Sequence, residues 1–99
     1  MVGGNGMDFT KGENRFYKEK NGQLLAEVTY VPDPEQNLAA IDHTFVDPSL
    51  RGQGIAEQLV DRVVGEMKKE DKKVKAVCPY VVDLFARKPD KYQDINSDE

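Results

Sequence analysis

The sequence predicts an α+β domain in which three antiparallel strands precede a helix, a parallel strand and a second helix, with the helices packed on the sheet. Residues 23–46 alternate apolar and polar side chains, which is typical of strands with one face against a core. Residues 54–70 change to a helical period, and a short apolar segment, 74–78, follows. A strand reached through a crossover helix is expected to be parallel, with a right-handed connection.

Turn residues divide the first half of the chain into three strands. The first opens at Phe16 and ends at Asn21-Gly22, a dipeptide typical of a type I′ hairpin turn, in which both central residues need a positive φ. The second covers about 23–31. Pro32 is expected to end it, because proline cannot donate a hydrogen bond to a neighbouring strand.

The third strand is predicted over about 38–46. Its alternation places Ile41, His43 and Phe45 on one face and the intervening residues on the other.

A broad apolar stripe predicts a helix over about 54–70, in which Gly65 costs about 1 kcal/mol relative to alanine. The stripe consists of Ile55, Ala56, Leu59, Val60, Val63, Val64 and Met67. The buried-type strand at 74–78 comes next. Pro79 suits the first turn of a second helix that runs to about Lys88, where Pro89 ends it.

The chain of 99 residues has the length of one domain. Residues 1–12 are rich in glycine without any period, and predict a flexible N-terminal tail. The folded domain is expected to cover 13–95, with a frayed C-terminus at 96–99.

Composition excludes several classes of function. The 18 acidic and 14 basic residues give a net charge of −4, which argues against a nucleic-acid partner. No apolar run approaches the roughly 20 residues that span a bilayer, and the N-terminus lacks a secretory signal, so we expect a cytoplasmic protein without membrane contact. Cys78 and His43 are the only cysteine and histidine, so no internal disulfide and no Cys/His metal site is expected.

The segment 47–56 carries the strongest functional signal. It joins a strand to the long helix, whose first N–H groups have no partner inside the helix and lie at its positive end. Gly52 and Gly54 let a bulky anion approach the backbone, and Arg51 adds a positive charge. These features predict a phosphate or pyrophosphate site.

Two nucleotide motifs fit this segment poorly. A Walker P-loop is excluded, because no Gly-Lys-Ser/Thr follows. A dinucleotide fingerprint lacks its third glycine, since Glu57 stands there, and the preceding strands form a meander. Residues 51–56, Arg-Gly-Gln-Gly-Ile-Ala, instead match the Arg/Gln-x-x-Gly-x-Gly/Ala loop of the GNAT acetyltransferase superfamily.

The chain resembles this superfamily over about 14–95, most strongly over 45–59, and lacks its outer N- and C-terminal elements. It is similar to a short GNAT-like branch that carries His-Thr-Phe-Val, Arg-Gly-Gln-Gly and Cys-Pro-Tyr segments. The resemblance implies a truncated GNAT fold and acetyl-CoA, or coenzyme A, as co-substrate. The pyrophosphate would lie on the loop and the pantetheine arm along the third strand. The residues implied in CoA binding are Phe45, Val46, Arg51, Gly52, Gln53, Gly54, Ile55 and Ala56.

Arg87 and Lys88 end the second helix. In one interpretation they reach the 3′-phosphate of CoA. Alternatively, they only answer the negative end of the helix dipole.

The resemblance also directs attention to the catalytic groups. Many GNAT enzymes use a tyrosine of the second helix to protonate the leaving thiolate, and Phe85 stands at that position here. Cys78 replaces a common asparagine and would face the acetyl group, with His43 lowering its pKa or accepting its proton. Alternatively, Cys78 is a small buried hydrophobic residue.

Two functions therefore remain open. The protein is either an N-acetyltransferase that moves an acetyl group from acetyl-CoA to an unknown amine, through Cys78, or a non-catalytic acyl-CoA-binding or acyl-carrying protein. The open sheet also makes a homodimer plausible.

Overall fold

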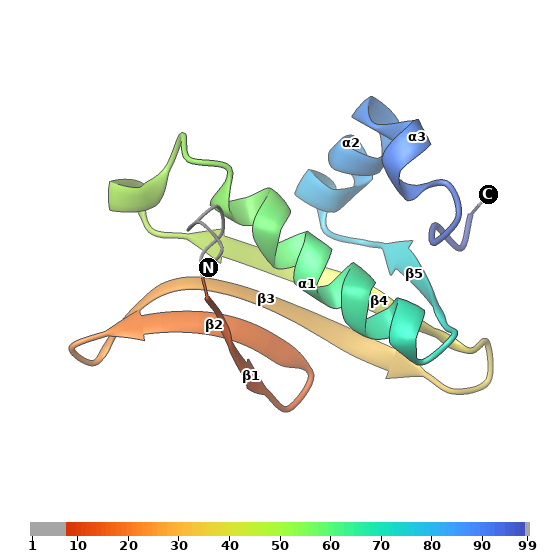
Figure 1. Cartoon of the computed structure of the whole chain (residues 1–99), viewed down its shortest axis with the longest axis horizontal. Coiled ribbons are helices and arrows are strands. Elements are labelled where there is room, and N and C mark those ends of the chain that lie inside the picture. The colour runs from red at the N-terminus through yellow and green to blue at the C-terminus, as the bar shows by residue number, and fades with distance from the viewer. Residues whose placement is uncertain (1–7, 99) are drawn as a thin grey trace, which may run out of the picture.

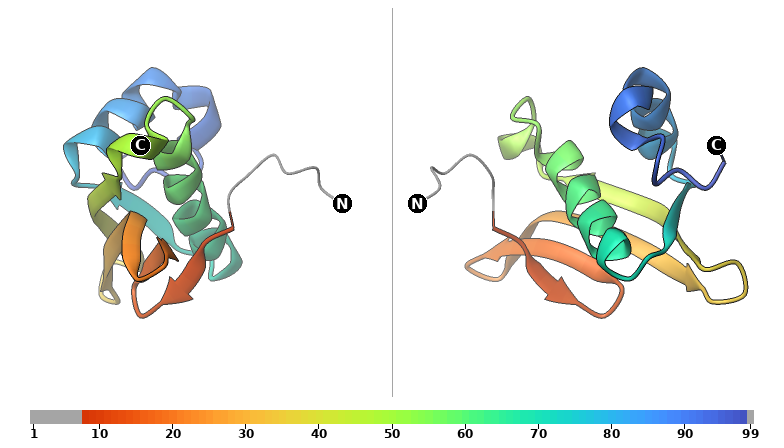
Figure 2. Two further views of the ribbon diagram at one scale, coloured as in Figure 1. Left: turned by 90° about the vertical axis from the view of Figure 1, so that its left-hand side faces the viewer. Right: turned by 45° about the vertical axis from the view of Figure 1, so that its right-hand side comes forward.

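The computed structural model describes residues 8–98. They form a five-stranded sheet in the order β1-β2-β3-β4-β5; α1 crosses one face of it, and α2 and α3 lie beside α1 (Figures 1 and 2). The strands are β1 (Thr10–Gly12), β2 (Arg15–Lys20), β3 (Gln23–Asp33), β4 (Leu38–Val46) and β5 (Lys73–Ala76). The helices are α1 (Ile55–Lys69), α2 (Pro79–Arg87) and α3 (Pro89–Tyr92), with a 3-10 turn at Pro48–Leu50.

The sheet confirms the predicted fold class. Strands β1 to β4 pair antiparallel in chain order, and β5 pairs parallel to β4 after the α1 crossover. The structure adds β1 and α3 to the predicted order. Residues 10–12 were assigned to the tail, but Thr10 pairs with Tyr17 and Gly12 with Arg15 in a tight antiparallel turn. Of the rest of the predicted tail, Phe9 is half-buried against the core, and residues 1–7 lie outside the described residues.

The prediction that Pro32 ends its strand is wrong, since β3 continues to Asp33 and Pro32 pairs with Ala39 of β4. The N–H of Tyr30 points to the β2 side, where it donates to the Asn14 carbonyl. Pro32 has the same orientation two residues later, and β2 does not extend that far. The missing N–H therefore faces a side without a strand, where proline is tolerated.

A bulge in β4 overturns part of the predicted alternation. Thr29 pairs with His43 and Tyr30 with Ile41, so Asp42 is an extra residue without a partner on β3. The extra residue shifts the alternation by one position, so the side chains after the bulge exchange faces of the sheet. Ile41 is fully buried, but the side chain of His43 is 55% exposed, so the two do not share a face as the alternation predicted.

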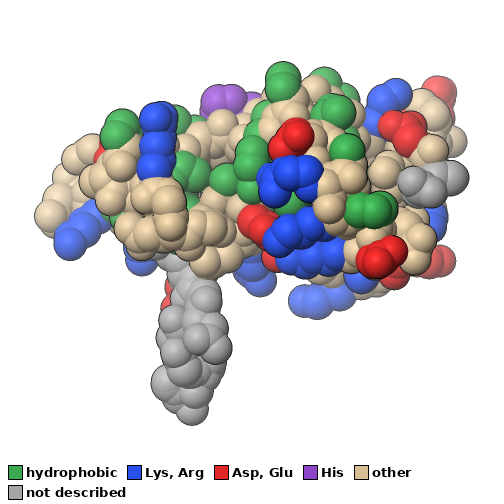
Figure 3. Space-filling model, turned by 90° about the horizontal axis from the view of Figure 1, so that it is seen from above, with side chains coloured by type: hydrophobic (Ala, Val, Ile, Leu, Met, Phe, Trp, Pro, Cys, Tyr) green, Lys and Arg blue, Asp and Glu red, His purple; other side chains and the backbone are tan. Residues whose placement is uncertain are grey.

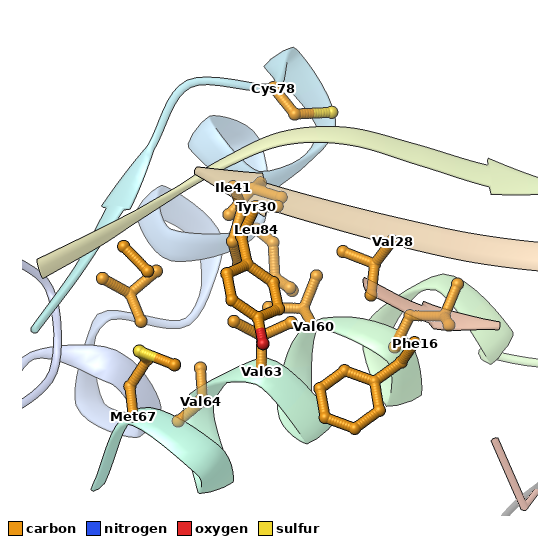
Figure 4. Packing of buried hydrophobic residues seen from close by; sticks show 14 of the residues in the cluster. Phe16, Val28, Tyr30, Ile41, Val60, Val63, Val64, Met67, Cys78 and Leu84 are labelled. Atoms are coloured by element: carbon orange, nitrogen blue, oxygen red, sulfur yellow. The ribbon is translucent and has the colours of Figure 1, made fainter. Parts of the chain in front are cut away.

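The core lies between the sheet and the helices (Figure 4). The buried stripe of α1 matches the predicted one, and Val81, Leu84 and Phe85 of α2 join it. Tyr92 and Ile95 pack back as expected, and both are buried. None of the helices within residues 8–98 is long and apolar enough to cross a membrane.

The C-terminal segment was predicted to be frayed from residue 96. Instead, Val74 of β5 donates its N–H to Ile95, and Ser97 donates to the Val74 carbonyl. Asn96 thereby forms a parallel bridge with Val74. Residues 95–97 thus cover part of the outer edge of β5, while Glu99 lies outside the described residues.

Two glycines of the α1 region should respond oppositely to alanine. Gly65 is an exposed helical residue, and a Cβ there would meet only open space, so Gly65→Ala should stabilise the fold by about 1 kcal/mol. Gly54 precedes the helix at φ 74°, which alanine adopts at a cost of about 1 kcal/mol or more. Urea unfolding of both variants checks this, and equal shifts of the midpoint would contradict it.

Candidate functional site

The loop between β4 and α1 is fixed by Asp47. Its backbone N–H donates to the Leu25 carbonyl, and its carboxylate accepts from the Ser49 hydroxyl at 2.6 Å and the Ser49 N–H at 3.0 Å. These two hydrogen bonds from Ser49 hold the pKa of Asp47 below its usual value. The 3-10 turn is therefore capped at its start, and Arg51, which follows it, has a defined position.

The N-terminus of α1 is open to a ligand. Gly54 occupies the cap position, no side chain caps the helix, and the first intrahelical bond runs from Gln58 N–H to the Gly54 carbonyl. Among the residues that the structure describes, no side chain caps the N–H groups of residues 55–57, so these groups are available to an anion. Gly52 and Gly54 have φ of 83° and 74°, and a Cβ added at either would have no atom within 4 Å.

This loop borders a shallow hollow of about 200 Å³. Six predicted CoA-site residues line it, namely Val46, Arg51, Gly52, Gly54, Ile55 and Ala56, together with Leu50 and Tyr80. Gln53 lies on the loop but is exposed and does not line the hollow. A larger hollow, of about 330 Å³, lies near the other end of α1 beside Tyr30 and Met67 and contains none of the predicted site residues.

Tyr80 is a site residue that sequence analysis missed. Pro79 starts α2, so Tyr80 stands in its first turn, and there it reaches the loop at the start of α1. Burial, then the charge of Glu57, raises the pKa of Tyr80. The sequence offered one signal for this role, because Tyr80 follows Pro79 at the start of the expected second helix, directly after the last strand.

Strands β4 and β5 diverge beyond Ile41 and Ala76, and the region between them is called the notch below. Their parallel pairing ends at Ile41 and Ala76, and the Ile41 carbonyl accepts the N–H groups of Val77 and Cys78. In the part of the chain that the structure describes, no strand pairs with β4 beyond Ile41 on this side. The last five residues of β4 therefore present a free edge.

Hydrogen-bond alternation decides which backbone groups face the notch. Asp47 N–H points to β3, so by alternation His43 and Phe45 also direct their backbone groups to β3. Thr44 and Val46 face the free edge. The backbone of Val46 therefore faces the notch, and the backbone of Phe45 faces away from it.

Cys78 lies beside this edge, at the cap position of α2, and is buried (Figure 4). Its Sγ is 3.5 Å from Thr44 Oγ1. Burial acts to raise the pKa of Cys78, but hydrogen bonds from the Thr44 hydroxyl and from the N–H groups of Tyr80, Val81 and Thr44 outweigh it. The net result is a thiol with a pKa below the ordinary value.

His43 is not brought together with Cys78. Thr44, its neighbour on β4, directs its side chain to Cys78, and successive side chains of a strand point to opposite faces. His43 Nε2 instead lies 4.0 Å from Glu27 Oε1 on the uncovered face of the sheet. The single histidine is visible at the surface in Figure 3.

Arg87 and Lys88 are both held in ion pairs. Arg87 Nε lies 2.6 Å from Asp83, and Lys88 Nζ lies 3.0 Å from each carboxylate oxygen of Glu57. The hydrogen bonds from Lys91 and then from Lys88 lower the pKa of Glu57. Basic and acidic side chains accordingly interleave on this surface (Figure 3).

Comparison with known proteins places this geometry in a family. The model of the GCN5-related N-acetyl-transferase family matches residues 15–95. A GCN5-like protein from Staphylococcus aureus, solved by NMR, is 34% identical, with a TM-score of 0.72, over 90% of this chain and 86% of that one. No curated protein matches the sequence.

Two more distant structures share the fold alone. A ribosomal-protein-alanine N-acetyltransferase from Brucella melitensis is 23% identical, with a TM-score of 0.56, over 74% of this chain and 59% of that one. Tetrahymena GCN5 is 14% identical, with a TM-score of 0.59, over 75% of this chain and 48% of that one.

The fold and the glycine loop thus define a GNAT-type acyltransferase domain. This chain belongs to the GCN5-related N-acetyltransferase family.

Proposed function

We propose that the protein binds acetyl-CoA between the α1 loop and the free edge of β4, and that it transfers the acetyl group to an amine. One observation carries the proposal. The uncapped N-terminus of α1, with two positive-φ glycines, borders a hollow that also includes Val46, whose backbone faces the notch. A phosphate-binding end and a strand-like binding edge are thus continuous.

Binding would divide the ligand between these two parts. The pyrophosphate would accept hydrogen bonds from the N–H groups of residues 53–56, with Arg51 supplying positive charge. The pantetheine arm would pair with the backbone of Val46 and with the Thr44 carbonyl as an added strand, which leaves the Thr44 N–H for Cys78. Phe45 would contribute little, because its backbone groups serve β3 and its side chain, like that of His43, lies on the uncovered face of the sheet.

The thioester would then lie beside Cys78. In the transfer that we propose, Cys78 Sγ attacks the acetyl carbon, the bond to the CoA sulfur breaks, and the thiol proton goes to the departing CoA thiolate. The amine then attacks the acetylated cysteine and releases the thiol. The Thr44 N–H, which points to Sγ, would stabilise the negative oxygen of the intermediate.

Phe85 favours a second candidate, an acyl-CoA-binding or acyl-carrying protein without transfer. It stands where many relatives have a proton-donating tyrosine, and its ring is buried and stacked on Tyr92 at 4.7 Å. In the absence of a hydroxyl at this position, the leaving thiolate depends on another acid.

Calorimetric titration with CoA, dephospho-CoA and pantetheine tests the binding proposal. CoA should bind, and pantetheine should bind much more weakly because it lacks the pyrophosphate. The difference in affinity between CoA and dephospho-CoA measures how much the 3′-phosphate contributes to binding. Arg87 and Lys88 must leave Asp83 and Glu57 to reach this phosphate. Equal affinity for CoA and pantetheine would remove the loop from the site.

Release of free CoA thiol from acetyl-CoA, measured with and without amines, separates the two candidates. Amine-dependent release supports transfer. Tight binding without release supports the carrier.

A further inference from the structure

Glu57 places a negative charge in the first turn of α1, directly after the N–H groups that are proposed to hold the pyrophosphate. The inference drawn from it rests on the proposed CoA site. The two residues before it, Ile55 and Ala56, line the loop hollow, and Tyr80 lines it from α2. Burial and then the charge of Glu57 raise the pKa of Tyr80, so the field of this carboxylate reaches the hollow. An uncompensated carboxylate here would repel a pyrophosphate.

Two lysines from the C-terminal part of the chain compensate this charge. Lys88, between α2 and α3, lies 3.0 Å from each carboxylate oxygen of Glu57, and Lys91 of α3 lies 2.5 Å from one of them. Lys91 also lies 3.1 Å from Asp61, one helical turn further along α1. The two carboxylates and two ammonium groups therefore form a neutral cluster where α3 lies beside α1 (Figure 2).

Tyr92 keeps this cluster in place. Its ring is buried and stacked on Phe85, and its hydroxyl donates to Asp61 at 2.7 Å. The side chain of Glu57 is only 22% exposed. Solvent and salt therefore screen this carboxylate only in part, and the two lysines supply most of the compensation.

We propose that Lys88 and Lys91 are positioning residues of the CoA site, which compensate the charge of Glu57 and thereby let the first turn of α1 accept a pyrophosphate. Lys88 then acts through Glu57 and not by contact with the 3′-phosphate. These two roles of Lys88 compete, because a lysine that leaves Glu57 for the 3′-phosphate returns a negative charge to the helix start.

Charge-removing variants titrated with CoA and dephospho-CoA test this inference. Lys91→Gln and Lys88→Gln should each weaken both ligands by the same factor, about fivefold, which is the size expected for one partly exposed ion pair. Lys91→Arg keeps the charge and should restore most of the affinity. Lys75→Gln removes the same charge from β5 at the level of Ala40, away from the loop, and should change neither affinity.

Glu57→Gln separates this role from a structural one. In that background, adding Lys91→Gln should weaken CoA by less than about twofold, because the charge that the lysine compensates has gone. A lysine that only holds α3 in place would weaken CoA in both backgrounds, and urea unfolding measures that loss of stability independently. Equal weakening with and without the Glu57 carboxylate, or no weakening in either, would overturn the inference.

The two ligands separate the remaining outcomes. If Lys88→Gln weakens CoA but not dephospho-CoA, Lys88 contacts the 3′-phosphate and its assigned role is overturned. A wild-type protein that binds neither ligand overturns the proposed function itself. CoA binding that does not depend on Lys88 and Lys91 overturns only their role as positioning residues.

Discussion

Gly54→Asp is expected to weaken CoA binding at least a hundredfold while the fold is retained. The new carboxylate would stand about 4–5 Å from the pyrophosphate, where two like charges repel by about 3–4 kcal/mol at an effective dielectric of 20. The backbone at φ 74° is one that aspartate adopts more readily than most residues, and the surrounding space is open.

Gly54→Asn is the matched control, since it has nearly the same shape and the same backbone preference without the charge. Calorimetry should find that its CoA affinity lies much closer to that of the wild type. Circular dichroism of both variants should match the wild type. If Asp and Asn weaken CoA equally, the loss comes from the backbone and not from a phosphate site at the α1 N-terminus.

Cys78 should react rapidly with iodoacetamide near neutral pH, and saturating CoA should slow the reaction. Alkylation follows the thiolate fraction, and the hydrogen bonds to Sγ, which lower the pKa of Cys78 below its ordinary value, shift that fraction to lower pH. Thr44→Val keeps the shape of the side chain but removes the hydroxyl that lies 3.5 Å from Sγ. The pH–rate profile of this variant should therefore shift to higher pH.

Acetyl-CoA should add one acetyl group to the wild-type protein by intact mass and none to Cys78→Ala. His43→Ala should leave the alkylation rate nearly unchanged, because the imidazole lies on the other face of the sheet. The pairing of Cys78 with His43 that the sequence suggested requires a slower reaction in this variant. A thiol that reacts only as denaturant unfolds the protein would show that Cys78 is structural.

Local patterns predicted the parts of the fold that depend on local chemistry. Asn21 and Gly22 adopt φ of 52° and 80°, as the hairpin dipeptide indicated. The apolar stripe located α1, and the glycine loop located the uncapped N-terminus of that helix, because each depends on residues close in sequence.

Features set by neighbouring strands escaped prediction. The Asp42 bulge exists only in the register of β4 against β3, and it moved His43 away from Ile41 and Cys78. Strand β3 continues through Pro32 because β2 does not extend that far, so no hydrogen bond to β2 is lost. Tyr80 reaches the site through the packing of α2 beside the loop, which no spacing in the sequence encodes.

The bridge between Val74 and Asn96 bears on how the protein is handled. An exposed strand edge is a template for pairing with other chains, and here the backbone of residues 95–97 occupies part of that template on β5. An affinity tag fused directly after residue 99 would be attached only a few residues beyond this bridge. Tags and fusion partners are therefore better placed before the first residue, because β1 lies at the opposite edge of the sheet from β5 (Figure 1).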